Sequence, residues 1–221
     1  NSSTIYRHSV AIAALSRGSY PIFPHFEHNE DGDEWPADRR SILLRDWLRE
    51  HGFRRVAALK AHLGAVLALR ASIYQDEANR IRLQILFLPQ RNGQVVPSFV
   101  LSSLRADETR FVTDNFFLPF GGFYPDHWYL LRRPLVRSLP HLLAIHERRL
   151  RQGAAEWQSW DSDPLAELNH QQRVLEQINT ELGFLFPRHL QDEHGMLTWA
   201  GRFRVWQELW MLNYFGRPRA Y

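Results

Sequence analysis

The chain has 221 residues, of which 44% are hydrophobic and 23% charged, so it has the length and composition of a folded protein with a buried core. It contains no cysteine, which excludes thiol nucleophiles, disulfides, iron–sulfur clusters and zinc sites with cysteine ligands. The formal net charge is only +3, and Lys60 is the one lysine among 27 basic residues. No apolar run is long enough to cross a bilayer and no secretory leader is recognisable, so we expect a cytoplasmic protein without a membrane partner.

The first quarter of the chain is predicted to be helical on both sides of a loop. Apolar residues recur at helical spacing in residues 4–17, whereas residues 19–38 contain three prolines and no hydrophobic period. Asp38 can complement the start of a helix over residues 37–50. A second, shorter helix is expected over residues 53–63.

The middle of the chain changes to the alternation of apolar and polar residues that is typical of β-strands. It predicts a three-stranded antiparallel meander over residues 65–74, 80–89 and 95–104. The first and third of these strands are expected to be the edges of the sheet, unless helices from the start of the chain cover them.

The hairpin between the second and third strands is predicted from the Asn-Gly pair at residues 92–93. Both residues tolerate the positive φ angles of a type I′ turn, which matches the twist of antiparallel strands. A two-residue turn at this place sets Ile85 opposite Val100 and Leu86 opposite Phe99.

The second half of the chain is predicted to consist of an aromatic loop followed by helices. Residues 105–126 lack a period and are read as a packed loop, and residues 127–152 as two helical pieces interrupted by prolines. Two further helices are expected over residues 165–182 and 199–215.

These elements predict a single α+β domain over residues 1–221, in which helices from both ends of the chain pack on a small, three-stranded meander in the middle. Its parts are a helical N-terminal region at 1–63, the meander at 64–104, and an aromatic loop with C-terminal helices at 105–221.

A first candidate site lies in the acidic loop before the second helix. His25 and His28 stand three residues apart with Glu27 between them, and four carboxylates follow within residues 30–34. Imidazole and carboxylate groups together suit Zn²⁺, Fe²⁺ or Mn²⁺. The alternative is a solvated acidic loop, because the two histidines need a helix to converge and the flanking prolines disfavour one.

A second candidate site is the aromatic stretch at residues 124–129, where Asp126 precedes His127. The pair is a candidate general base, and together with residues 25–34 it defines a hypothetical metal-dependent enzyme. The alternative is a helix start with Asp126 as the cap.

A third candidate function is nucleic-acid binding through arginine. Acidic residues are interspersed almost one for one, which weakens this interpretation, and no nucleic-acid-binding motif is present. Arginine pairs occur at residues 39–40, 54–55, 132–133 and 148–149.

The sequence contains no serine-nucleophile elbow, phosphate-binding glycine loop, dinucleotide fingerprint or metalloprotease helix, and it implies no cofactor. We therefore expect a non-catalytic recognition or accessory subunit that binds a peptide or protein partner, for instance one that presents a substrate peptide to a separate maturation enzyme. An extended peptide added to the edge strand at 95–104 is the expected mode, within a hetero-oligomer. The residues expected to bind this partner are Arg80, Arg82, Arg91, Phe99, Leu101, Phe120, Phe123 and Trp128.

Overall fold

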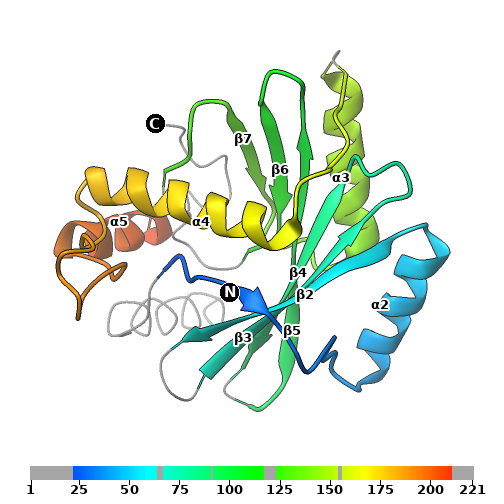
Figure 1. Cartoon of the computed structure of the whole chain (residues 1–221), viewed down its shortest axis with the longest axis horizontal. Coiled ribbons are helices and arrows are strands. Elements are labelled where there is room, and N and C mark those ends of the chain that lie inside the picture. The colour runs from blue at the N-terminus through cyan, green and yellow to red at the C-terminus, as the bar shows by residue number, and fades with distance from the viewer. Residues whose placement is uncertain (1–21, 64–66, 91, 117–122, 154–155, 211–221) are drawn as a thin grey trace.

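The computed structural model describes residues 22–63, 67–90, 92–116, 123–153 and 156–210 of the chain. In this part, seven strands form one sheet whose strand order follows the sequence, and four helices accompany it (Figure 1). The strands are β1 (Glu27–His28), β2 (Arg54–Leu63), β3 (Leu67–Gln75), β4 (Arg82–Pro89), β5 (Val95–Leu104), β6 (Arg110–Asp114) and β7 (Trp128–Arg132). The helices are α2 (Arg39–Glu50), α3 (Leu139–Gln152), α4 (Pro164–Glu181) and α5 (Trp199–Trp210).

The predicted fold class is wrong, because the sheet is much larger than a three-stranded meander. The three predicted strands correspond to β3, β4 and β5, with bounds within two residues of those expected. The sheet continues through β2 and β1 on one side and through β6 and β7 on the other. Neighbouring strands are antiparallel except for β6 and β7, so the sheet is mixed.

Residues 53–63, predicted to be a helix, form β2 from Arg54 onward. The end of α2 explains the change of direction: Gly52 has a φ angle of 73°, and the Phe53 N–H donates to the Leu48 carbonyl at 2.9 Å. This hydrogen bond and a left-handed glycine form a Schellman cap, which turns the chain straight into the strand. Alanines in the segment favour a helix locally, but Leu59 and Ala61 are buried with the two-residue period of a strand.

The sequence also missed β6 and β7. β6 lies inside the predicted aromatic loop, and β7 occupies the first residues of the predicted helical region at 127–152. Each is five residues long, which is too short for its period to be distinguished from that of a helix. Asp126 therefore precedes a strand and does not cap a helix.

The predicted register of the β4–β5 hairpin is wrong by one residue. Ile85 pairs with Phe99, and Pro89 pairs with Val95. Beyond them the Gln90 N–H donates to the Gln94 carbonyl at 2.7 Å, so three residues connect the paired ends instead of two. Gly93 supplies the positive φ, 75°, that three-residue hairpin loops need at their last position.

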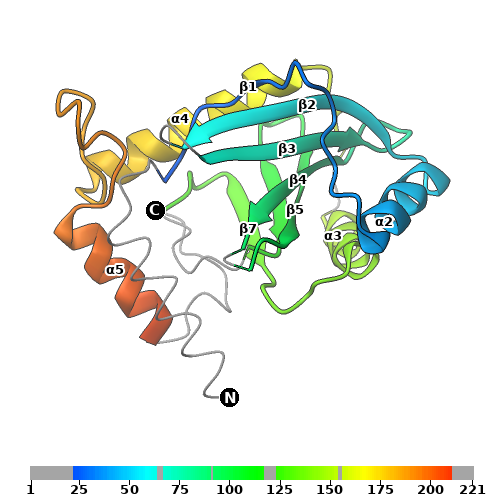
Figure 2. The ribbon, with the colours of Figure 1, turned by 90° about the horizontal axis from the view of Figure 1, so that it is seen from below.

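The two faces of the sheet are covered by different helices, with α2 and α3 on one side and α4 on the other (Figure 2). Leu48 of α2 and Leu142 of α3 share a buried cluster with Phe99. On the opposite face, Leu168 of α4 packs in a second cluster with Leu86. Each central strand thus contributes alternate side chains to two cores.

The starts of α2, α4 and α5 confirm the predicted helix starts within two residues. Asp38 accepts from the backbone nitrogens of Arg40 and Ser41 at 2.9 and 3.1 Å, and Asp163 accepts from that of Ala166 at 2.8 Å. The helix predicted for residues 4–17 and the end of the last predicted helix lie outside the described residues. None of the described helices combines the length and apolar character needed to span a bilayer.

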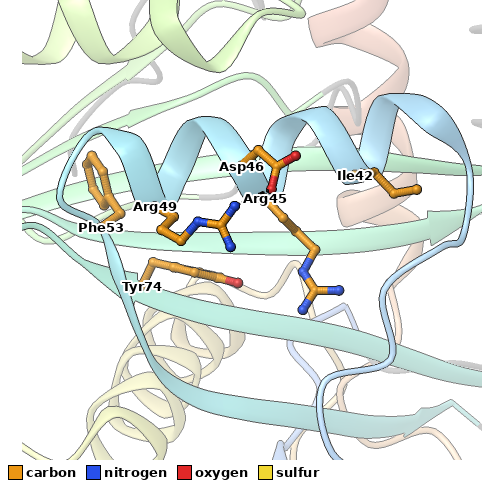
Figure 3. A pocket seen from close by; sticks show the side chains of 6 residues that line it. All are labelled: Ile42, Arg45, Asp46, Arg49, Phe53 and Tyr74. Atoms are coloured by element: carbon orange, nitrogen blue, oxygen red, sulfur yellow. Dashed lines mark hydrogen bonds and ion pairs between the residues drawn. The ribbon is translucent and has the colours of Figure 1, made fainter.

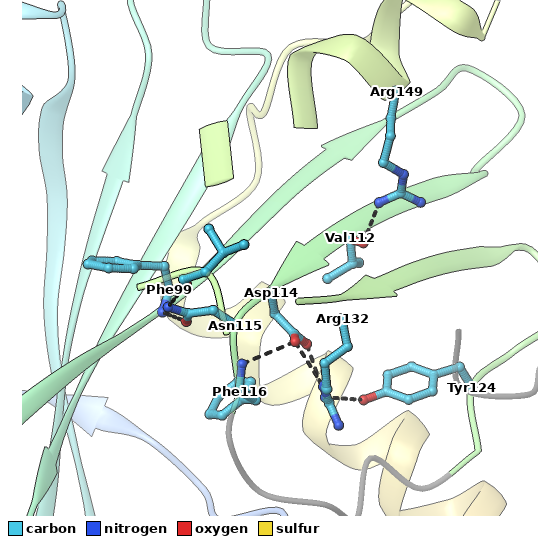
Figure 4. Close-up of polar contacts among 9 residues, drawn as sticks. Phe99, Val112, Asp114, Asn115, Phe116, Tyr124, Arg132 and Arg149 are labelled. Carbon is cyan, nitrogen blue, oxygen red and sulfur yellow. Dashed lines mark hydrogen bonds and ion pairs between the residues drawn. The ribbon is translucent and has the colours of Figure 1, made fainter. Parts of the chain in front are cut away.

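A buried ion pair joins the two parallel strands. Arg132 on β7 donates to both carboxylate oxygens of Asp114 on β6, at 2.8 and 3.0 Å, and both side chains are almost fully buried (Figure 4). Burial alone would lower the pKa of Arg132, but the charge of Asp114 and the Tyr124 hydroxyl raise it above its ordinary value. The guanidinium therefore remains charged inside the protein.

We expect Arg132→Met to lower the free energy of unfolding by about 3–5 kcal/mol, because it leaves the Asp114 carboxylate buried without a counter-charge. The control is Arg105→Met, which removes a more exposed ion pair with Asp107 at 3.6 Å and should lower it by at most about 1 kcal/mol. Urea unfolding followed by circular dichroism measures both. Equal losses in the two variants would contradict a structural role for the buried pair.

Candidate functional site

The residues predicted to bind a partner do not gather on one surface. Phe99 and Leu101 are buried in the core beneath α2 and α3. Trp128 is buried on the opposite face against Leu175 of α4, and Arg82 is buried among groups that precede α4. These four side chains are part of the protein interior.

The remaining predicted partner-binding residues are scattered. Arg80 is exposed in the turn before β4, and Phe123 is half-buried with its ring stacked on Phe184 at 5.5 Å. Arg91 and Phe120 lie outside the described residues.

The strand expected to accept a peptide is not a free edge. β5 pairs with β4 on one side, and from Val100 to Leu104 it pairs with β6 on the other. Next to this pairing, Asn115 accepts from the Phe99 N–H at 2.7 Å through its side chain, and its own N–H donates to the Phe99 carbonyl at 3.2 Å (Figure 4). Only residues 95–98 extend beyond β6, and among them Pro97 has no N–H to donate. Among the described residues, β5 therefore offers an added strand at most the short stretch at residues 95–98.

The acidic loop proposed as a metal site is tied to the sheet by its own carboxylates. Asp33 accepts a hydrogen bond from Ser72 and lies 3.4 Å from Arg55. Glu34 pairs with Arg70 on β3, and this interaction lowers the pKa of Glu34. These contacts hold the loop against the outer strands β2 and β3.

The histidines of the proposed metal site lie apart from its other half. His25 and His28 are exposed at β1, whereas Asp126 and His127 are exposed just before β7, and β1 and β7 are the opposite ends of the sheet. Glu27 lies 3.1 Å from the His62 ring. Among the described residues no group of three or more histidine and carboxylate side chains is placed to hold a metal ion.

A hydroxyl–imidazole cluster that the sequence did not reveal lies between α3 and the sheet. The His146 ring nitrogens lie 3.0 Å from the Ser103 hydroxyl and 2.8 Å from the Thr113 hydroxyl, and Arg149 donates to Thr113 at 2.7 Å. A serine beside a histidine is the geometry of an activated nucleophile. Here, however, His146, Ser103 and Thr113 have no exposed surface, so no substrate reaches them. The cluster is structural.

A second hidden polar cluster lies on the α4 face. The Arg82 guanidinium lies 4.5 Å from the Trp160 ring, and the Arg110 guanidinium lies between Trp160 and Trp128, at 5.5 and 4.6 Å. Glu167 of α4 accepts from Arg110 at 2.5 Å. Burial lowers the pKa of Arg82 to about 10. The ion pair of Arg110 with Glu167 attaches the start of α4 to the sheet, and Arg82 donates to Gln75 and to the Ser162 carbonyl.

In the part of the chain that the structure describes, a groove with a volume of about 250 Å³ lies between α2 and β3. Arg45 and Arg49, one helical turn apart, extend from α2 toward Tyr74 of β3 (Figure 3). The groove is lined by Ile42, Arg45, Asp46, Arg49, Phe53 and Tyr74.

The electrostatics of this groove favour hydrogen-bond donation. Tyr74 is buried except for a small fraction, and its burial, together with the negative charge of Asp33, raises its pKa to about 12. The phenol therefore keeps its proton at neutral pH and uses it in a hydrogen bond to Asp33. The Arg45 guanidinium lies 5.6 Å from the Trp35 ring, and Arg49 pairs with Asp46 at 2.7 Å in an exposed contact.

The sequence did not predict this groove, although the residues that α2 contributes to it can be recognised by their spacing. Ile42, Arg45 and Arg49 recur at helical spacing and therefore share one side of the predicted helix. Tyr74 comes from a strand that the sequence did not place next to this helix. Comparison of the chain with protein-family models, with curated proteins and with solved structures finds no significant match.

The buried imidazole predicts a pH dependence of stability. Burial, and to a lesser extent the charge of Arg149, lower the pKa of His146 from 6.5 to about 3 in the folded protein. Between these two pKa values the unfolded chain binds more protons than the folded protein. The stability that the neutral, buried imidazole contributes is therefore complete above pH 6.5 and is lost as the pH falls toward 3. His146→Gln keeps a polar side chain that does not titrate.

Between about pH 6.5 and about pH 4.5 we expect the free energy of unfolding to fall by about 2 kcal/mol more in the wild type than in His146→Gln. Urea unfolding at each pH measures the two slopes, and their difference removes the contribution of the other histidines. Parallel slopes would show that His146 is charged or accessible in the folded protein.

Proposed function

We propose that the protein is a recognition module that binds an acidic segment of a partner polypeptide on α2. The class of function is the one expected from the sequence, an accessory subunit without catalysis of its own. The partner, however, contacts the helix α2 and not the edge of a strand. The observation that supports it is the groove in which two guanidinium groups and one phenol from different elements face the same space.

Charge complementarity indicates the chemistry of the partner. α2 carries four arginines (39, 40, 45 and 49) against two acids, Asp46 and Glu50, so 4 − 2 gives it a net charge of +2. All four arginines are exposed. Guanidinium groups donate two parallel hydrogen bonds to a carboxylate.

Apolar groups beside the arginines favour a polypeptide. Ile42 and Leu43 are 51% and 57% exposed on α2, beside the arginines. Arginine and aromatic groups around a small pocket are typical of the anchor points of protein interfaces. A volume of about 250 Å³ accommodates one anchoring side chain but is small for a whole substrate.

The same surface is less suited to nucleic acid. Ile42 and Leu43, exposed beside the arginines on α2, would lie against charged phosphates without gaining contacts. An acidic amphipathic peptide satisfies both the charged and the aliphatic groups.

Selection of a random peptide display library on the purified chain tests this proposal. We expect the selected peptides to be enriched in Asp and Glu next to aliphatic residues, because such peptides pair with the arginines and cover Ile42 and Leu43. The double substitution Arg45→Glu/Arg49→Glu should weaken their binding at least about tenfold, measured by fluorescence anisotropy, which corresponds to ~1.4 kcal/mol.

The matched control is Arg148→Glu/Arg151→Glu, which changes the net charge equally at exposed positions of α3 and should leave the affinity unchanged. Selected peptides without an acidic bias, or equal binding by the α2 double variant, would overturn the proposal. Circular dichroism melting confirms that both double variants are folded.

A further inference from the structure

α5 presents an aromatic face to solvent. Trp199, Phe203 and Trp206 are 82%, 62% and 49% exposed, at spacings of four and three residues that place them on one side of the helix. The Phe203 and Trp206 rings stack at 5.8 Å, and the Arg202 guanidinium lies 5.5 Å from the Trp199 ring. Exposed aromatic side chains gathered in this way mark a contact surface.

The packing of α5 fixes this orientation. A Cβ atom on Gly201 would lie 2.2 Å from the Phe184 carbonyl oxygen, so the helix approaches the preceding segment as closely as glycine allows. Val205, one turn further along, is fully buried with Leu185 and Leu197. A rotation of α5 that buried its aromatic face would break these contacts. The packing of the helix therefore keeps the aromatic face exposed.

The sequence from residue 199 to residue 221 has the composition of an interfacial segment. It contains seven aromatic residues among 23 positions. Its four arginines (202, 204, 217 and 219) oppose one acid, Glu208, so 4 − 1 gives a net charge of +3 for the segment, equal to that of the whole chain. Tryptophan and tyrosine prefer the boundary between headgroups and acyl chains, and arginine adds attraction to anionic headgroups.

We propose that the aromatic face of α5 lies on the surface of a lipid bilayer that contains anionic lipids. The helix has 12 residues and carries charged side chains, so it lies in the plane of the interface and does not cross it. Trp199, Phe203 and Trp206 enter the headgroup boundary, while Arg202 remains at the level of the phosphates. This contact concerns the surface only and is compatible with the absence of a spanning helix among the described residues.

Vesicle flotation with the full 221-residue chain tests this proposal. We expect at least about tenfold stronger partitioning onto phosphatidylcholine vesicles that contain roughly one third phosphatidylglycerol than onto phosphatidylcholine alone. The double substitution Trp199→Ser/Phe203→Ser should reduce the partitioning about tenfold or more, because it removes apolar area but no charge. Brominated lipids should quench the tryptophan fluorescence of the wild type more than that of Trp199→Phe.

The matched control is Leu135→Ser, which removes an apolar side chain that is 67% exposed between β7 and α3 and should leave vesicle binding unchanged. The proposal is overturned if the wild type stays unbound with anionic vesicles or if the double variant binds as well as the wild type. A wild type that sediments as a dimer and a double variant that sediments as a monomer would assign the face to self-association instead. Thermal melting shows whether the variants are folded.

Discussion

The pairing of β5 with β6 is the constraint on which the rest of the structure depends. It gives the last half of β5 a hydrogen-bonded neighbour on each side, which converts the hairpin of the central strands into the middle of a large sheet. β6 then offers its other edge to β7 in parallel orientation, and the buried contact between Asp114 and Arg132 joins these two strands. Because parallel neighbours need a crossover, the chain returns from the end of β6 to the start of β7 before α3 begins.

This arrangement explains why so much of the polar chemistry of the chain is internal. Ser103 on β5 and Thr113 on β6 face α3, where the His146 ring bridges them. On the opposite face, Arg82 of β4 and Arg110 of β6 lie among tryptophan rings beneath α4. Buried polar groups are stabilised by pairing, and here the hydrogen bonds of His146 hold α3 on the sheet and the ion pair of Arg110 with Glu167 holds α4 on it, although Nε and Nη1 of Arg110 have no hydrogen-bond partner among the described residues. The side chains of both clusters are buried.

Local signals in the sequence were sufficient for several elements. Asp163 followed by Pro164 predicts the start of α4, and alternation of apolar and polar residues predicts β3, β4 and β5 within two residues. These elements could be predicted because the information lies within a few neighbouring residues: a side chain that accepts backbone N–H groups, or a period of two.

Other elements depend on partners that are distant in the sequence. β2 is rich in alanine and has no strong local preference for a strand, and it becomes one because Gly52 turns the chain and β3 offers its edge. β7 has five residues, and its apolar run is compatible with a helix until β6 pairs with it. The candidate groove has the same origin, since Arg45 and Arg49 are readable as one side of a helix but Tyr74 reaches them only through the packing of α2 on the sheet.

The two surfaces proposed for binding lie at opposite ends of the molecule, so both can be occupied at the same time. In Figures 1 and 2, α2 is at one end of the sheet and α5 is at the other, beyond the end of α4. Their chemistry also differs, because α2 combines arginine with aliphatic side chains whereas α5 combines arginine with aromatic ones. A flat lipid surface against α5 would leave the groove on α2 accessible to a polypeptide. The two proposals therefore do not compete for one surface, and each depends on a different set of contacts within the same sheet.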